Sequence, residues 1–403
     1  MHPHTITILG GGAAGFFAAV IAKEAHPTAR VTILEKTAQL LGKVRISGGG
    51  RCNVTHACFD PKELVKNYPR GHKELLGPFH RFQPRDTMEW FESRGVRLKA
   101  EEDGRVFPRS DSSETIIQCL MQEAASLGVI IRTQTDIQSI AREEEGFVLT
   151  GKTDRIVTDR LILATGNSRI GHQWAQGLGH TIQSAVPSLF TFNCPPFGLT
   201  DLAGIAVPHA VASLQGRRLK QSGPLLITHW GFSGPAALKL SAWEARYLAE
   251  QNYKVGLTIC WVGERAKDEI LQWLQENKHH YPSQSLYNHP YFDIPKNLWN
   301  RLLERSRVPD GPLAMLRNEE LGRFAETLTQ DLYQVDGKTT HKAEFVTCGG
   351  VTLSEVHFQT MESRLCPGLF FVGEILDIDG VTGGFNFQNA WTTGFLAGTA
   401  SGK

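Results

Sequence analysis

The chain has 403 residues, which is enough for more than one domain and for a large hydrophobic core. Its 42 Lys and Arg residues nearly balance its 41 Asp and Glu residues, and this net charge of +1 argues against a nucleic-acid partner. Seven cysteines without CxxC or zinc-type spacing, and the lack of a signal-peptide pattern or an apolar run of about 20 residues, predict a cytoplasmic protein with no metal and no membrane partner.

A dinucleotide-binding βαβ unit is predicted at the start of the chain. Its elements are a β-branched strand at residues 5–9, an Ala-rich helix at 13–25 and a second strand at 30–34. The turn between the first two contains Gly10, Gly12 and Gly15, which allow a tight turn, the approach of a diphosphate and close packing of the helix. Glu35 follows the second strand, where a carboxylate suits a ribose hydroxyl. This unit fits NAD as well as FAD.

A second glycine-rich segment covers residues 42–53 and is predicted to be a polar loop. Its three consecutive glycines are tolerated where a ligand or another backbone passes closely. Ser47, Arg51 and Asn53 supply donors suited to a diphosphate or to flavin carbonyl oxygens. Taken without its neighbours, the segment fits a solvated surface loop equally well.

Helical and strand patterns then alternate as far as residue 166. The helices are expected at 87–94 and 113–127, and the strands at 128–132, 146–150 and 160–164. The last strand ends in Ala164, Thr165 and Gly166, a small corner that could lie beside a nucleotide. A simple turn at a strand end is an equally good interpretation of this tripeptide.

The pattern changes near residue 188 and changes back after about residue 342. Short strands are predicted at 206–214, 224–228 and 255–261, and more helical, polar stretches at 264–277 and 295–328. We therefore predict a discontinuous nucleotide-binding domain with segments at 1–190 and 341–403, and an inserted domain at 191–340.

The insert contains the segment THWGFSGP at residues 228–235. Gly231, Gly234 and Pro235 favour a loop that leads into a helix, with Ser233 as a possible cap. His229 is either a hydrogen-bonded structural histidine or an acid, since imidazole can transfer protons near neutral pH.

The end of the chain changes the interpretation of its beginning. An apolar strand at 368–372 leads to Gly373 and Glu374, and a glycine pair opens a small-residue helix at Gly384, Phe385 and Asn386. Glu374 can hold ribityl hydroxyls, and the positive end of the helix can stabilise a reduced flavin. The two ends together predict FAD rather than NAD in this domain.

Four motifs, at residues 47–53, 228–235, 346–351 and 373–386, resemble those of the BaiN/YhiN-like flavoproteins. The resemblance extends from about residue 4 to 399. It implies an α/β fold: a three-layer FAD/NAD(P)-binding domain of the glutathione-reductase-like group, with a parallel sheet, interrupted by an insert with a β-barrel-like part and a small helical part. Phe385 and Phe387 stand where the family commonly has Tyr and Leu, and Val44-Arg45 is a variant of the usual loop.

The family also implies non-covalent FAD, with NAD(P)H as the electron donor. Matched onto this chain, the FAD contacts are Gly10, Gly12, Ala13, Ala14, Gly15, Glu35, Lys36, Lys43, Ser47, Gly48, Arg51, Asn53, Ala164, Thr165, Gly166, Gly373, Glu374, Gly384, Phe385 and Asn386.

We therefore expect an FAD-dependent, NAD(P)H-linked oxidoreductase that acts on a small organic substrate, such as an activated enone double bond. The family's named activity is the reduction of a conjugated double bond in a 3-oxo bile acid. If an enone is reduced, Arg51 is the candidate to polarise its carbonyl and His229 to protonate carbon. A flavin-dependent monooxygenase and a non-enzymatic flavin-binding regulator are the alternatives. The oligomeric state stays open, as does the electron donor, which is NADH, NADPH or another reductant.

Overall fold

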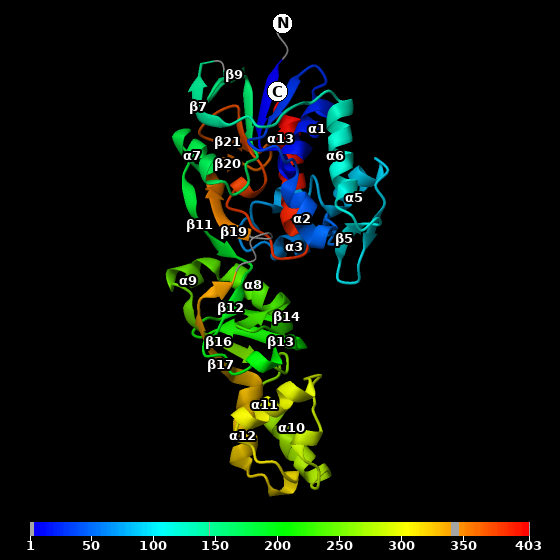
Figure 1. Cartoon of the computed structure of the whole chain (residues 1–403), viewed down its shortest axis with the longest axis vertical. Coiled ribbons are helices and arrows are strands. Elements are labelled where there is room, and N and C mark those ends of the chain that lie inside the picture. The colour runs from blue at the N-terminus through cyan, green and yellow to red at the C-terminus, as the bar shows by residue number, and fades with distance from the viewer. Residues whose placement is uncertain (1–3, 145, 340–345, 403) are drawn as a thin grey trace. The chain divides into compact units, whose positions relative to one another are not determined.

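The computed structural model describes residues 4–144, 146–339 and 346–402 (Figure 1). The chain divides into two compact units: a main unit, Met1–Val186 with Val346–Lys403, and an inserted unit, Pro187–Phe345. The first predicted boundary stood at residues 190 and 191. The second, at 340 and 341, lies outside the described residues.

A seven-stranded sheet with the order β20-β21-β22-β10-β1-β2-β6 forms the centre of the main unit (Figure 1). The strands from β22 to β6 pair in parallel, and β20 and β21 are antiparallel. Their bounds are β1 Thr5–Leu9, β2 Arg30–Leu34, β6 Ile130–Arg132, β10 Arg160–Leu163, β20 Val356–His357, β21 Glu362–Ser363 and β22 Leu369–Phe371. The predicted α/β class with a parallel sheet is confirmed.

Two small-residue helices, α1 (Ala13–Ala25) and α13 (Phe385–Ala400), pack closely together in the main unit. A Cβ atom added at Gly398 would lie 2.6 Å from the carbonyl oxygen of Ala18, and one added at Gly394 would lie 3.1 Å from that of Ala14. The two glycines stand one helical turn apart, so they let the backbones of the first and last helices approach each other. This contact places the two ends of the chain side by side.

Smaller elements surround this sheet in the main unit. The helices are α2 Gly42–Gly50, α3 Pro61–Leu64, α4 Leu76–Phe79, α5 Pro84–Glu92, α6 Glu114–Ser126 and α7 Arg169–Gly177. The strands are β3 Thr55–His56, β4 Leu98–Ala100, β5 Arg105–Pro108, β7 Ile137–Glu143, β8 Gly146–Gly151, β9 Arg155–Thr158, β11 Ile182–Ser188 and β19 Val346–Val351, and the last two residues of β11 already belong to the inserted unit. They form the sheets β3-β5-β4, β7-β8-β9 and β11-β19.

The predicted loop at residues 42–53 is wrong in its first half, because α2 begins there. Leu41 adopts a left-handed conformation and its carbonyl accepts from Arg45 N at 3.1 Å, which starts a helical turn. The helical geometry then fails at Ser47, Gly48 and Gly49, where two glycines have positive φ angles. The segment is therefore a short helix followed by a sharp glycine turn.

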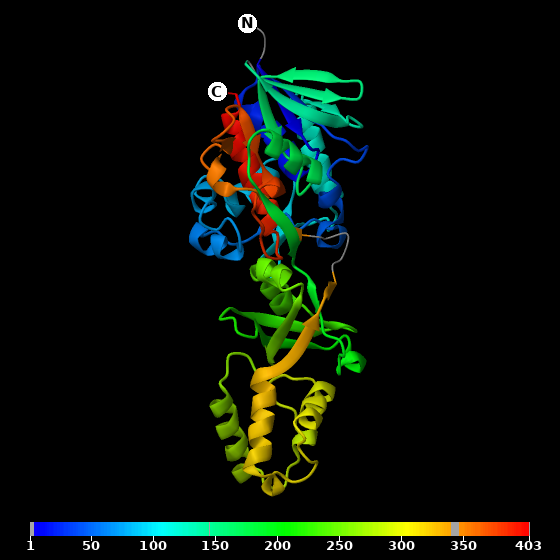
Figure 2. The ribbon, with the colours of Figure 1, turned by 90° about the vertical axis from the view of Figure 1, so that its left-hand side faces the viewer.

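The inserted unit combines an antiparallel sheet with helices, as Figure 2 shows. The sheet has the order β17-β16-β13-β14-β15-β12-β18. Its strands are β12 Thr191–Asn193, β13 Ala206–Leu214, β14 Lys220–Ile227, β15 Gly231–Ser233, β16 Lys254–Cys260, β17 Asp331–Asp336 and β18 Lys338–Thr339. The helices are α8 Pro235–Trp243, α9 Ala245–Glu250, α10 Lys267–His280, α11 Lys296–Arg305 and α12 Asn318–Gln330. One hydrophobic core runs through this unit and includes Phe232, Trp261 and Trp299.

Across the described ranges, no helix is both long and apolar enough to cross a membrane.

The close approach of α1 and α13 yields a stability prediction. Gly398→Ala would push a methyl group against the Ala18 carbonyl, so we expect a loss on the order of 1–3 kcal/mol in the free energy of unfolding. Gly177→Ala is the matched control, because a Cβ atom at the end of α7 meets nothing within 4 Å. Urea unfolding of both variants measures the effect, and equal stability of the two would show that the close contact is not required.

Candidate functional site

The glycine turn after β1 touches the end of β10. Gly10 has a φ of +113°, and a Cβ atom there would overlap the carbonyl of Ala164. A Cβ atom at Gly15 would overlap the carbonyl of Gly10. A Cβ atom at Gly12, in contrast, would meet nothing within 4 Å. Two glycines of the turn therefore serve backbone packing, while Gly12 borders open space.

Glu35 is held at the end of β2 by three hydrogen bonds. Its carboxylate accepts from Gly11 N at 2.9 Å, and from the backbone N and the hydroxyl of Thr37, both at 2.9 Å. A carboxylate offers about four lone-pair sites, so acceptor capacity remains for a further donor. These hydrogen bonds fix the orientation of the Glu35 carboxylate beside the glycine turn, which is what an acid that binds a ribose hydroxyl requires.

The C-terminal half of the site meets the N-terminal half directly. Gly373 has a φ of +72°, and a Cβ atom there would lie 2.9 Å from that of Ala14 at the start of α1. The next residue, Glu374, forms an ion pair with Lys43 of α2. One carboxylate oxygen of Glu374 lies 3.6 Å from where Gly166 would carry a Cβ atom. Segments from the front, middle and back of the chain therefore converge here.

The start of α13 is fixed by Asn53. With its amide oriented to satisfy both ends, Asn53 accepts from Gly384 N at 3.0 Å and donates to the carbonyl of Thr55 at 3.0 Å. Gly384 is left-handed, with a φ of +93°, and supplies no side-chain cap. The N–H groups of the first helical turn thus lack a side-chain cap, which makes this helix end suited to negative charge.

The residues of this site fit FAD. Open space borders three glycines, Gly12, Gly49 and Gly50. A backbone that binds a diphosphate closely needs such space beside it. Within the part of the chain that the structure describes, the amide of fully buried Asn389 and the buried hydroxyl of Thr165 have no hydrogen-bond partner. Together with the uncapped helix end and Glu35, these features fit a dinucleotide that carries a flavin.

Some side chains that were predicted to contact FAD form hydrogen bonds or ion pairs with other groups of the protein. Lys36 lies 3.1 Å from the carboxylate of Asp136 and is exposed, and the Ser47 hydroxyl donates to the carbonyl of Val44 at 3.0 Å. The amide of Asn386 makes hydrogen bonds of 2.8 and 3.1 Å with the backbone of Gly380. Ser47 and Asn386 shape the loops around the site, and their contact with FAD stays a prediction.

Two aromatic residues that the sequence did not single out enclose Phe385. The ring of His56 stacks on Phe385 at 4.7 Å between centroids, and the hydroxyl of buried Tyr68 donates to the carbonyl of Phe385 at 2.6 Å. His56 lies only three positions after Asn53, so its nearness to the glycine-rich segment was the available signal. Tyr68 offered none, because its partner is 317 residues away.

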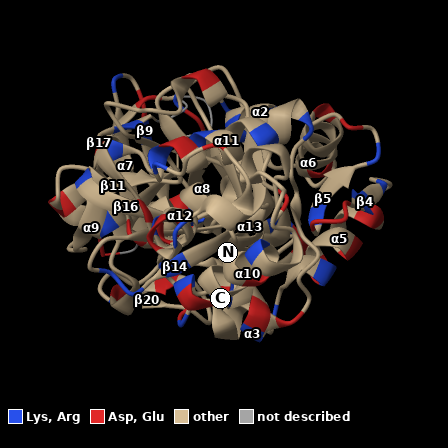
Figure 3. Ribbon diagram, turned by 90° about the horizontal axis from the view of Figure 1, so that it is seen from below, with Lys and Arg blue, Asp and Glu red and all other residues tan. Residues whose placement is uncertain are grey.

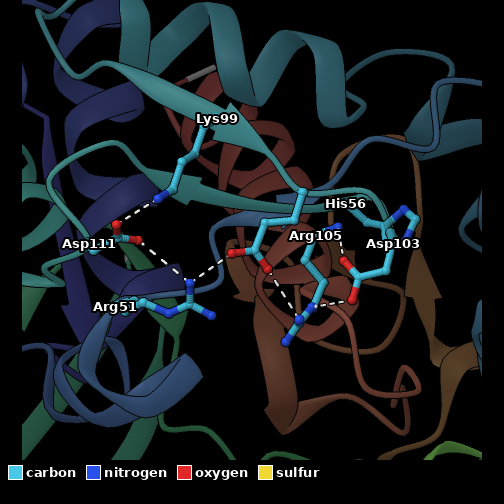
Figure 4. Close-up of polar contacts among 7 residues, drawn as sticks. Arg51, His56, Lys99, Asp103, Arg105 and Asp111 are labelled. Carbon is cyan, nitrogen blue, oxygen red and sulfur yellow. Dashed lines mark hydrogen bonds and ion pairs between the residues drawn. The ribbon is translucent and has the colours of Figure 1, made fainter. Parts of the chain in front are cut away.

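Arg51 belongs to a charge network on the β3-β5-β4 sheet (Figure 4). Its Nη1 lies 2.8 Å from Glu101 Oε1 and 3.6 Å from Asp111 Oδ1, and its guanidinium stands 3.8 Å above the ring of Phe107. The hydrogen bond to Glu101 raises the pKa of Arg51. These contacts brace the glycine turn against the sheet, and a role in polarising a substrate carbonyl stays a prediction.

His229 lies in the inserted unit, on the turn between β14 and β15, where its side chain is exposed. Its role as a proton donor also stays a prediction.

A Ser-His-Glu arrangement occurs elsewhere in the main unit. His180 Nε2 lies 2.8 Å from Ser363 Oγ, and its Nδ1 lies 3.1 Å from Glu355 Oε2. However, Ser363 Oγ also accepts from the backbone N of Leu365 and Cys366, at 3.0 and 2.8 Å, and the residue is buried. Burial is the largest influence on His180 and lowers its pKa. This network is structural, because the serine oxygen is both occupied and shielded.

The glycine turn yields a pair of variants that separates folding from FAD binding. Gly12→Ala should fold normally, because its methyl group enters open space, but should bind FAD at least about tenfold more weakly if a diphosphate fills that space. Gly15→Ala should destabilise the apoprotein itself. Thermal unfolding and FAD titration measure both effects, and full FAD affinity in Gly12→Ala would contradict this placement.

Among the relatives of this chain, two have nearly equal similarity to it. The ribosomal RNA dihydrouridine synthase of Escherichia coli (strain K12) is 31% identical, over 96% of this chain and 95% of the relative. The 3-dehydro-bile acid delta(4,6)-reductase of Clostridium scindens is 29% identical, over 99% of both chains. The similarity therefore covers the main unit and the inserted unit alike.

Among solved structures, the 3-ketosteroid-delta4-(5alpha)-dehydrogenase of Rhodococcus jostii RHA1 matches all of both chains, with a TM-score of 0.53 and 14% identity. This likeness is one of fold. A family model described as the HI0933-like protein Rossmann domain matches residues 4–400. The resemblance to the BaiN/YhiN-like proteins is thus confirmed, and the chain belongs to the HI0933-like Rossmann family.

Proposed function

We propose that this chain is an FAD-dependent oxidoreductase that takes electrons from NAD(P)H and reduces a carbon–carbon double bond conjugated with a carbonyl group. The observation that carries the proposal is the convergence of the glycine turn, Glu35, Glu374 and the uncapped start of α13 in one place. Such a set suits FAD, with the adenosine and diphosphate groups at one end and the flavin ring at the other.

The names of the two relatives support this reaction class. A delta(4,6)-reductase of a 3-dehydro bile acid acts on double bonds conjugated with the 3-oxo group. A dihydrouridine synthase saturates the ring double bond of uridine, which is conjugated with a ring carbonyl. The acceptors differ greatly in size, yet each reaction adds a hydride and a proton across the same kind of bond.

The residues of this chain would bind, orient and protonate. FAD, when bound, supplies the hydride. Glu35 would accept from a ribose hydroxyl, and the start of α13 would stabilise negative charge at the pyrimidine end of the flavin. The α-carbon of the acceptor needs a proton as the hydride arrives, and we assign its delivery to the imidazole of His229.

NAD(P)H is proposed as a transient electron donor. The sequence contains no second Gly-x-Gly-x-x-Gly turn that would hold a nicotinamide dinucleotide in the same manner. A donor that reduces the flavin and leaves needs no such permanent site. NADH and NADPH are therefore both to be offered in the assay.

A small organic enone is the first candidate acceptor, and a uracil in RNA is the second. The second rests on the name of the 31%-identical relative. The near-neutral chain, whose Lys and Arg are interspersed with Asp and Glu in Figure 3, favours the first, since RNA binding relies on clustered positive charge.

Anaerobic stopped-flow spectroscopy tests the proposal. NADH or NADPH should bleach the flavin absorbance, and a steroid enone or a uridine-containing RNA should restore it. If only oxygen restores it and a hydroxylated product forms, the chain is a monooxygenase. If neither nicotinamide reduces the flavin but chemically reduced flavin still passes its electrons to an acceptor, the donor is another reductant. If no acceptor reoxidises the reduced flavin, the regulator alternative stands.

Replacement of the proposed proton donor tests its role separately. His229→Ala should lower the turnover number by about 10²- to 10⁴-fold without loss of flavin, the usual range for removal of a general acid. His209→Ala is the matched control, since His209 is also an exposed histidine of the inserted unit. Unchanged turnover in His229→Ala would exclude it as the acid.

A further inference from the structure

The segment from Thr228 to Ser233 forms a tightly bonded turn between β14 and β15. Thr228 N donates to the carbonyl of Gly231 at 2.8 Å, and the Thr228 hydroxyl donates to the same carbonyl at 3.0 Å. That hydroxyl also accepts from the backbone N of Trp230 and Gly231, at 3.3 and 3.2 Å. One threonine therefore fixes the backbone of the whole turn.

The flanking residues attach the turn to the sheet. The carbonyl of Trp230 accepts from Cys194 N at 2.8 Å, and a Cβ atom at Gly231 would overlap the carbonyl of Phe192. Phe232 is fully buried in the core of the inserted unit, and the Ser233 hydroxyl lies 3.0 Å from that of Thr191. These contacts explain most of the THWGFSGP motif by structure alone.

Two side chains of the turn have no such structural task, those of His229 and Trp230. Trp230 is 67% exposed, and among the described residues it is the only one of the eight tryptophans whose side chain lies largely in solvent. An indole left in water forgoes the favourable burial of a large apolar surface. The fold itself does not require this tryptophan at the tip of a rigid turn.

On the strands next to Trp230, the described residues include no second exposed large hydrophobic side chain. The other exposed large hydrophobic residues described in the inserted unit are Tyr281, Met315 and Leu332, and none of them belongs to β12, β14 or β15. An apolar protein interface needs a contiguous patch of several hundred Å². A single exposed indole instead matches the area of one flat ring.

We propose that Trp230 is an aromatic platform that stacks on the flat, carbonyl-conjugated ring of the acceptor, with His229 beside it at the same tip. The inference rests on the proposed function, because that function requires a planar conjugated ring. The flat π face of an indole binds such a ring with little sequence or substituent preference. A steroid enone and a uracil share this chemistry, which suits both acceptor candidates.

Two probes distinguish the sources of the ring: 4-androstene-3,17-dione and a short oligouridylate. Isothermal titration of the flavin-loaded full chain should detect binding of at least one. Trp230→Ala should weaken that binding by roughly 5- to 100-fold, the range for loss of one stacked base, whereas Trp230→Phe should stay within about threefold. Met315→Ala, which removes another exposed apolar side chain of the same unit, should change nothing.

Steady-state kinetics separate this inference from the proposed function. With the probe that binds, Trp230→Ala should raise the KM and leave both the flavin content and the rate of flavin reduction by NAD(P)H unchanged. Normal turnover with an unchanged KM would overturn the platform and leave the reductase intact. Failure of both probes to bind the wild-type chain, or equally weak binding by Trp230→Phe and Trp230→Ala, would also overturn it.

Discussion

The close packing of α1 against α13 is the constraint on which the site depends. Gly394 and Gly398 let the last helix lie against the backbone of the first, at positions where a methyl group would meet a carbonyl oxygen. Each helix starts at one half of the site: α1 at the glycine turn and α13 at Gly384. Since both starts are set by one helix pair, the expected diphosphate and flavin positions are held relative to each other by backbone contacts rather than by flexible side chains.

The charged and polar groups of the site are held in place in addition to its backbone. The starts of α1 and α13 have no side-chain cap, which suits negative charge there. Two carboxylates, Glu35 and Glu374, are oriented by hydrogen bonds or an ion pair. The Glu374–Lys43 pair also connects the C-terminal strand end to α2. In the inserted unit, the Thr228 hydroxyl fixes the backbone of the Thr228–Ser233 turn through hydrogen bonds. The side chains of His229 and Trp230 in this turn are exposed. The main unit thus suits cofactor binding, and the turn suits contact with an acceptor.

The sequence predicted the βαβ unit well because its signals are local: a β-branched strand, a glycine turn and an Ala-rich helix at their usual spacing. The α1 bounds, Ala13–Ala25, agree with the prediction. The helical start of α2 was missed because glycine and basic residues there resemble a loop. The His56–Phe385 stack and the Lys43–Glu374 ion pair join residues more than 300 positions apart. No local periodicity reports such contacts, whereas the family motifs indicated which segments would meet.

The most direct test of the central claim is a comparison of FAD and FMN binding to the apoprotein by visible absorption and calorimetry. If the front of the chain holds the adenosine half of the cofactor and the back holds the flavin, FAD should bind tightly at one molecule per chain. FMN, which lacks the half that the glycine turn and Glu35 would hold, should bind far more weakly. Equal affinity for the two flavins, or no binding of either, would contradict a site built from both ends of the chain.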